Sequence, residues 1–128
     1  MARAPLVTAL PADPVTVYAS GTQTITASGD SGLLDTGSVA NGILSVFVNG
    51  GATGTTPSLQ VNFDVQDGNG NWLTVQSLTA ITSGPNFAFG SVGPGSGGYI
   101  LTGKGRVRWV VTGTTPSFTG VTISLIGR

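Results

Sequence analysis

The sequence predicts an all-β fold, an antiparallel β-sandwich or jelly roll of about eight short strands preceded by an extended N-terminal arm. No window of the 128-residue chain places apolar residues at the i, i+3, i+4 and i+7 spacing of a surface helix. Several runs instead alternate between apolar and polar residues, which is typical of strands with one buried face. Segments rich in Gly, Pro, Asn and Ser separate these runs and favour turns.

The first 14 residues differ from the remainder of the chain. They contain three of the seven prolines, and proline fixes φ and removes a backbone donor. We therefore expect an extended arm at 1–14 and a single β-sandwich domain at 15–128, a size common for domains. The arm either docks on a neighbouring molecule, for example by adding a strand to its sheet, or folds back onto its own domain. Its candidate interaction residues are Arg3, Pro5, Leu6 and Pro11.

Alternating runs predict the strands one by one. Residues 15–19 and 22–27 alternate and predict two strands, separated by Ser20-Gly21, which can form a tight turn. Residues 28–42 are rich in Gly, Ser and Asp and are expected to form a loop. The remaining predicted strands are 43–49, 59–66, 72–78, 86–92, 105–112 and 119–126.

The strand at 59–66 has the clearest alternation. Its odd-numbered residues, from Leu59 to Val65, are apolar and are expected to face the core, whereas the even-numbered residues, Asp64 among them, are polar and are expected to face water. The segment Asp67 to Asn71 that follows has residues that tolerate positive φ, which predicts a hairpin turn before the next strand.

One motif occurs twice. The sequence GTTPS stands at 54–58 and again at 113–117, each time between an alternating run and a large apolar residue. Gly and Pro favour tight turns, so we expect two hairpins of similar construction. The second of these would join the strands at 105–112 and 119–126.

Charged residues are scarce. They make up 8% of the chain, and the formal net charge is zero, whereas about 25% is usual. A surface with so little charge suits a protein that works inside an assembly. The four cations near the end of the sequence are too few for a nucleic-acid footprint, and no run of about 20 apolar residues predicts a membrane span. No signal peptide is recognisable, so we expect synthesis in the cytoplasm.

Catalytic residue types are missing. The chain has no His and no Cys, which excludes Ser-His-Asp and Cys-His machinery and the usual His or Cys metal sites. Asp64 and Asp67 form the closest acidic pair, but no apolar pocket is evident to raise either pKa. The run from Asp67 resembles the start of a calcium loop, yet Trp72 and Leu78 stand where such a loop needs Gly and Glu. We expect no enzyme activity, no metal and no cofactor.

Three residues of the domain are candidates for interaction. Arg106 and Arg108 lie on the face of their predicted strand opposite Val107 and Trp109. They could pair with acidic residues of a neighbouring protein or with Asp64 on an adjacent strand. Trp72 follows a turn and could present an exposed ring to a sugar, whereas Trp109 is expected in the core.

The residues at 43–72 and at 105–128 resemble small virion proteins of tailed bacteriophages. The similarity lies in the strand, the GTTPS motif, the alternating strand ending in Gln66-Asp67, and the closing Arg-x-Arg strand with its second GTTPS. It implies a capsid decoration (cementing) protein that binds and stabilises the assembled shell on the virion surface. The implied partners are the major capsid protein and copies of the chain itself in a homo-oligomer, for which a trimer would be natural. The alternatives are a head–tail connector, a minor tail protein or a carbohydrate-binding module on a virion fibre.

Overall fold

A computed structural model of the chain describes residues 13–93 and 103–128, and in these residues the fold is all-β with no helix, as the sequence predicts. The arm residues Arg3, Pro5, Leu6 and Pro11, and the Gly-rich run at 94–102, lie outside the described residues. The strands are β1 (Val15–Ala19), β2 (Gln23–Ile25), β3 (Gly29–Asp30), β4 (Leu34–Asp35), β5 (Gly42–Val48), β6 (Ala52–Gln66), β7 (Trp72–Ser77), β8 (Asn86–Val92) and β9 (Lys104–Gly127).

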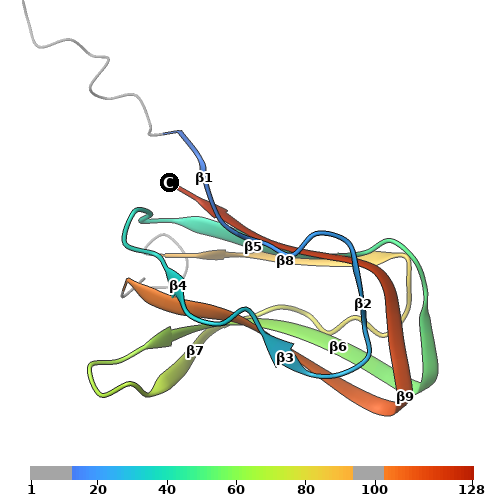
Figure 1. Cartoon of the computed structure of the whole chain (residues 1–128). Helices are drawn as coiled ribbons and strands as arrows, with labels where there is room; N and C mark the ends of the chain where they lie inside the picture. Colours follow the sequence, from blue (N-terminus) through green and yellow to red (C-terminus); the bar gives the residue numbers. More distant parts are fainter. Residues whose placement is uncertain (1–12, 94–102) are drawn as a thin grey trace, which may run out of the picture.

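All strand pairs are antiparallel and belong to one sheet, which folds over on itself until it is nearly barrel-shaped. Its central order is β7-β6-β9-β5-β8, and β1 to β4 pair one after another along β9. Figure 1 shows the two layers that result: β8, β5, β1 and the second half of β9 form one, and β7, β3 and the first half of β9, with most of β6, form the other. The long strands β6 and β9 pass from one layer to the other at a sharp corner.

The GTTPS motifs form this corner and are not hairpin turns. The prediction of two hairpins was wrong, because β6 and β9 each run through their motif as a single strand of 15 and 24 residues. Gly54 and Gly113 have φ of 106° and 117°, and Thr56 and Thr115 both have φ of 46°. These conformations bend the strand without reversing it, as β-bulges do. The segments 105–112 and 119–126 are therefore two halves of β9 and do not pair with each other.

The two motifs lie directly against each other in a nearly twofold arrangement. Thr55 pairs with Thr114, and the register shifts on both sides of this pair. An added Cβ on Gly54 would lie 2.6 Å from the carbonyl oxygen of Thr115, and one on Gly113 would lie 2.7 Å from that of Thr56. The identical sequences thus make closely similar bends, and each glycine provides the space in which the partner backbone lies.

The tight turn that Ser20-Gly21 could form between 15–19 and 22–27 is not a reversal of the chain. β1 and β2 both pair with β9 and not with each other. At the join between them, Ser20 donates its backbone N–H to Ile123 O at 2.9 Å and accepts a bond from Ile123 N on its hydroxyl at 2.9 Å. The chain therefore follows β9 around its bend, and Ser20-Gly21 is a corner and not a reversal.

The core fills the space between the two layers. The predicted inner face of 59–66 is confirmed, because Leu59, Val61, Phe63 and Val65 are all buried. Alternate residues of β5 and of the second half of β9 oppose them from the other layer. The predicted β6–β7 turn is confirmed as well: Asp67 N donates to Asn71 O at 2.9 Å, and the Asp67 carboxylate accepts the N–H of Asn69 and of Asn71 at 2.8 Å. The expected loop at 28–42 contains the two short strands β3 and β4.

Candidate interaction surfaces

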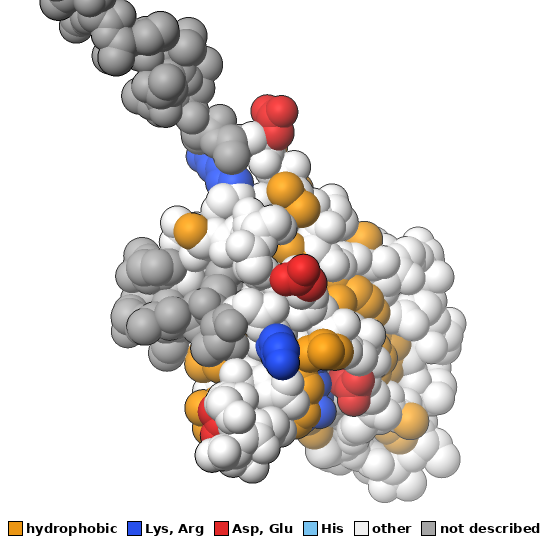
Figure 2. All heavy atoms as spheres, turned by 60° about the vertical axis from the view of Figure 1, so that its left-hand side comes forward, with side chains coloured by type: hydrophobic (Ala, Val, Ile, Leu, Met, Phe, Trp, Pro, Cys, Tyr) orange, Lys and Arg blue, Asp and Glu red, His pale blue; other side chains and the backbone are white. Residues whose placement is uncertain are grey.

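The two layers differ in charge. The strands of the layer formed by β1, β5, β8 and the second half of β9 contain no charged residue. Within strands, the charged residues of the described chain lie on β3, β4, β6 and the first half of β9. Figure 2 shows one face of the molecule, on which charged groups are few and are scattered among uncharged ones. The molecule therefore has one uncharged layer and one that carries a small charged network.

That network is centred on Asp64 in β6. Asp64 is 1% exposed, although the alternation of its strand predicted a solvent-facing carboxylate. Arg106 and Arg108 each donate their Nε–H to Asp64 Oδ2 at 2.8 Å, and the Thr74 hydroxyl donates to Oδ1 at 2.6 Å. Asp64 does point away from the core, but the two arginines from the neighbouring strand cover it. The structure thus contains the pairing with Asp64, which was one of the alternatives for these arginines.

The arginines set the protonation state of Asp64. Burial alone raises the pKa of this carboxyl, but the hydrogen bonds from Arg108, Thr74 and Arg106 outweigh burial and leave the pKa below its ordinary value. Asp64 is therefore ionised at neutral pH, and one carboxylate faces two guanidinium groups. This arrangement ties β6, β7 and β9 together and contains no group set up for acid–base catalysis.

Trp72 belongs to the same network. It is half-buried, and the Arg106 guanidinium carbon lies 4.4 Å from the centre of its ring. Such a cation–π contact fixes both side chains. Arg106 thus occupies one face of the ring, the kind of surface on which a sugar would stack. Trp109, expected in the core, is partly buried and packs against it.

A strip of exposed phenylalanines crosses the outer face of the uncharged layer. Phe47 of β5 and Phe87 of β8 are paired in register and stack with ring centres 5.3 Å apart. The Phe89 ring follows at 6.2 Å from Phe87. The three side chains are 42%, 53% and 66% exposed. We call Phe47, Phe87 and Phe89 the aromatic strip.

The sequence contained a signal for this strip that strand alternation alone did not reveal. The inner residues of β5 are Leu44, Val46 and Val48, yet its outer residues include Ile43 and Phe47. A strand with apolar residues on both faces is expected to be covered on both faces. In this fold one of those faces is exposed.

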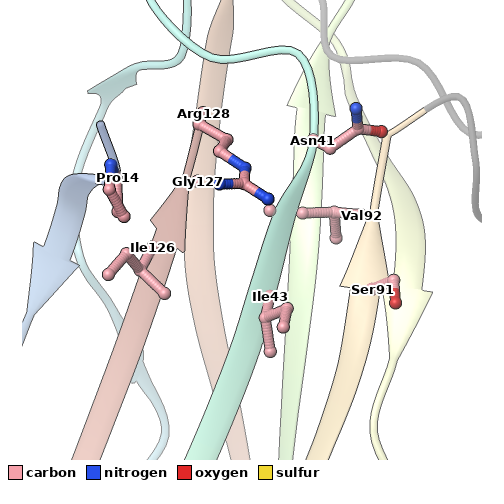
Figure 3. Close-up of a pocket in the computed structure, with 9 residues that line it drawn as sticks. Pro14, Asn41, Ile43, Ser91, Val92, Ile126, Gly127 and Arg128 are labelled. Atoms are coloured by element: carbon pink, nitrogen blue, oxygen red, sulfur yellow. The ribbon is translucent and has the colours of Figure 1, made fainter. Parts of the chain in front are cut away.

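A groove lies at the other end of the same layer. Its volume is about 410 Å³, and it is lined by Pro14, Asn41, Gly42, Ile43, Ser91, Val92, Ile126, Gly127 and Arg128. Figure 3 shows Pro14 and Ile126 on one side, Val92 and Ser91 on the other, and Ile43 between them. We call this the end groove. Ile43 and Ile126, its exposed apolar side chains, are neighbours in register on β5 and β9.

In the part of the chain that the structure describes, no group of three or more acidic, His or Cys residues is placed to hold a metal ion. No helix long and apolar enough to cross a membrane is found at 13–93 or 103–128. Comparison of the chain with protein-family models, with curated proteins and with solved structures finds no match.

Proposed function

We propose that this chain is a structural protein of a tailed-bacteriophage virion, a capsid decoration protein that attaches to the assembled shell through the aromatic strip. The observation that carries the proposal is the strip itself. Three stacked phenylalanines on an uncharged sheet face are unfavourable to leave in water, and aromatic residues are enriched in the cores of protein interfaces. The resemblance of 43–72 and 105–128 to small virion proteins supplies the class of partner.

The surroundings of the strip support docking against another protein. Its neighbours on the outer face are small hydroxyl residues: Ser45 lies opposite Phe89, and Thr122 lies opposite Phe47. A flat face of this kind has no ion pairs to desolvate on binding. An apolar centre with an uncharged polar border is the usual anatomy of an interface.

The proposed mechanism is thermodynamic. A protein that binds the assembled shell, and not the separated capsid subunits, shifts the equilibrium towards the shell by mass action. The stabilisation is RT ln(1 + [L]/Kd) for each site, about 2.7 kcal/mol when the free protein is at 100 times Kd. Many copies on one particle multiply this effect, and no catalytic group is required.

The test is co-sedimentation with expanded, undecorated capsid shells made from the major capsid protein of the same genome. The unmodified chain should sediment with the shells, and Phe87→Ser/Phe89→Ser should reduce binding at least about 100-fold, since loss of two central aromatic contacts is worth about 3 kcal/mol or more. Leu73→Ser is the matched control, because Leu73 is 51% exposed but lies on β7 of the charged layer. Failure of the unmodified chain to bind shells would overturn the proposal. If Leu73→Ser reduced shell binding as much as the double phenylalanine variant, the aromatic strip would not be the binding surface.

A sugar-binding role is the second candidate that the sequence left open. It would use Trp72, whose ring is held against Arg106 in this structure. The same shell experiment, repeated with Trp72→Ala, should show unchanged binding. A connector or minor tail protein would instead form a closed ring that ignores expanded shells.

A further inference from the structure

We infer that the end groove receives the N-terminal segment of a second copy of this chain, so that copies are joined by exchanged arms. The inference concerns a different site from the aromatic strip. Phe47 in the strip follows Ile43 in the groove by four positions, roughly 13 Å along β5. It is independent of shell binding and can be tested without shells.

The groove has the chemistry of a site for an apolar peptide. Ile43 and Ile126 are 48% and 40% exposed, and Val92 and Pro14 extend the apolar lining across β8 and the start of β1. The volume of about 410 Å³ falls in the range of about 300–1,000 Å³ typical of ligand sites. Gly42 and Gly127 add little bulk to the lining, and Asn41, Ser91 and Arg128 are its polar residues.

The N-terminal segment has the matching chemistry. In residues 1–12 only Arg3 and Thr8 have polar side chains, and Leu6 and Leu10 are the largest aliphatic ones. Twelve residues of extended chain span up to about 40 Å. That length is sufficient for such a segment to contact a neighbouring copy.

The direction of the chain favours a second copy over the segment's own domain. Val15 pairs with Gly127 in antiparallel register, so the chain at Asp13 and Pro14 is directed past the end of β9. Folding back onto its own groove would require a reversal of direction near residues 10–14. Pro11 and Pro14 oppose this, because the residue before a proline is kept in extended conformation. The groove lies where the segment leaves one molecule, so neighbouring copies can exchange segments reciprocally in a closed oligomer.

The chain contains no cysteine, so engineered cysteines can report this contact without background. Leu6→Cys and Ile43→Cys are prepared separately, mixed and oxidised, and a disulfide-linked dimer containing one of each is expected. Leu6→Cys mixed with Leu73→Cys is the matched control, because Leu73 is about as exposed as Ile43 but lies on the other layer. This control should give several-fold less dimer.

The double variant Leu6→Cys/Ile43→Cys distinguishes the two occupants. Exchange between copies predicts linked oligomers, whereas closure within single chains would show that the groove takes its own segment and would overturn the inference. Cross-linking no stronger than in the Leu73→Cys control would overturn it as well.

Light scattering gives a second measurement on the full chain. The unmodified chain should form an oligomer whose mass falls to that of one chain in Leu6→Asp/Leu10→Asp and in Ile43→Asp. Circular dichroism checks that each variant keeps its strands, and Leu73→Asp should leave the mass unchanged. Arm exchange without shell binding would refute the proposed function alone, and shell binding by a monomer would refute arm exchange alone.

Discussion

The environment of Asp64 in the fold differs from the one that its own strand predicts. Read along β6 it is one polar residue in an alternating strand, and in the fold it is 1% exposed. Two arginines two positions apart on β9 converge on one of its oxygens. A buried carboxylate is tolerated only when it is paired and hydrogen-bonded. The pair Arg106 and Arg108 is therefore required by Asp64, whatever else those side chains contact.

This dependence predicts how stability changes with pH. The folded pKa of Asp64 lies below its unfolded value, which is about 3.9, so its contribution is fully present above pH ~4 and is lost as pH falls through the folded pKa. Asp64→Asn should lower the free energy of unfolding by about 1–3 kcal/mol at neutral pH. Urea unfolding should show that the difference in free energy of unfolding between Asp64→Asn and the unmodified chain becomes smaller below pH ~4.

The double variant Arg106→Met/Arg108→Met should show the opposite change in stability with pH. It leaves the carboxylate buried without cations, which costs about 3–5 kcal/mol at neutral pH. Burial then raises the folded pKa, so this variant should regain stability as the pH falls towards ~4. The free energy of unfolding of Asp64→Asn, compared with that of the unmodified chain, provides the check. If this difference were the same at neutral pH and below pH ~4, pairing with the two arginines would not explain the contribution of Asp64.

At the scale of the elements, the bends in β6 and β9 decide the architecture. Each long strand contributes to both layers because its GTTPS motif turns it through the corner (Figure 1). The bend depends on positive φ at a glycine and on the absence of a Cβ beside the partner backbone. The corner is therefore the position at which small substitutions should have the largest effect on the fold.

Gly54→Ala and Gly113→Ala should destabilise the domain to a similar extent. Each introduces a Cβ within 2.7 Å of a facing carbonyl oxygen at a φ above 100°. Strain of this kind costs about 1–3 kcal/mol, and thermal unfolding of the two variants should give losses in that range that agree with each other. Gly51→Ala is the control, because a Cβ there meets nothing within 4 Å and φ is not positive. A loss at only one of the two glycines would refute the equivalence of the motifs.

Strand positions and the β6–β7 turn could be predicted from the sequence, whereas the connections at Ser20-Gly21 and at the GTTPS motifs could not. The alternation at 15–19, 43–49, 59–66 and 86–92 depends on which side chains are buried, and that information is local. Whether Gly and Pro reverse a strand or only bend it depends on what lies opposite, and for GTTPS the opposite segment is its own repeat 59 positions away in the sequence. The aromatic strip and the end groove were missed for the same reason, because each joins residues from strands far apart in the chain.

At the scale of the whole molecule, the two layers provide different surfaces. One contains the Asp64 network, and the other contains the aromatic strip, the end groove and no charged residue within its strands. With a formal net charge of zero, long-range steering cannot contribute much to association. A partner that covers the aromatic strip therefore meets apolar rings and uncharged hydroxyl side chains and forms no ion pair with these strands.

Shell binding through the aromatic strip is therefore expected to depend little on salt. Raising the ionic strength from ~0.05 M to ~1 M shortens the Debye length from above 10 Å to about 3 Å, which weakens complexes held by exposed charges. Binding through the aromatic strip should change by less than about threefold and should show a negative heat-capacity change, the mark of buried apolar surface. Isothermal titration of shells at several temperatures and two salt concentrations measures both quantities. A loss of affinity of tenfold or more in high salt would place the contact on the charged layer, where Arg106, Arg108 and Lys104 lie, and the aromatic strip would then need another explanation.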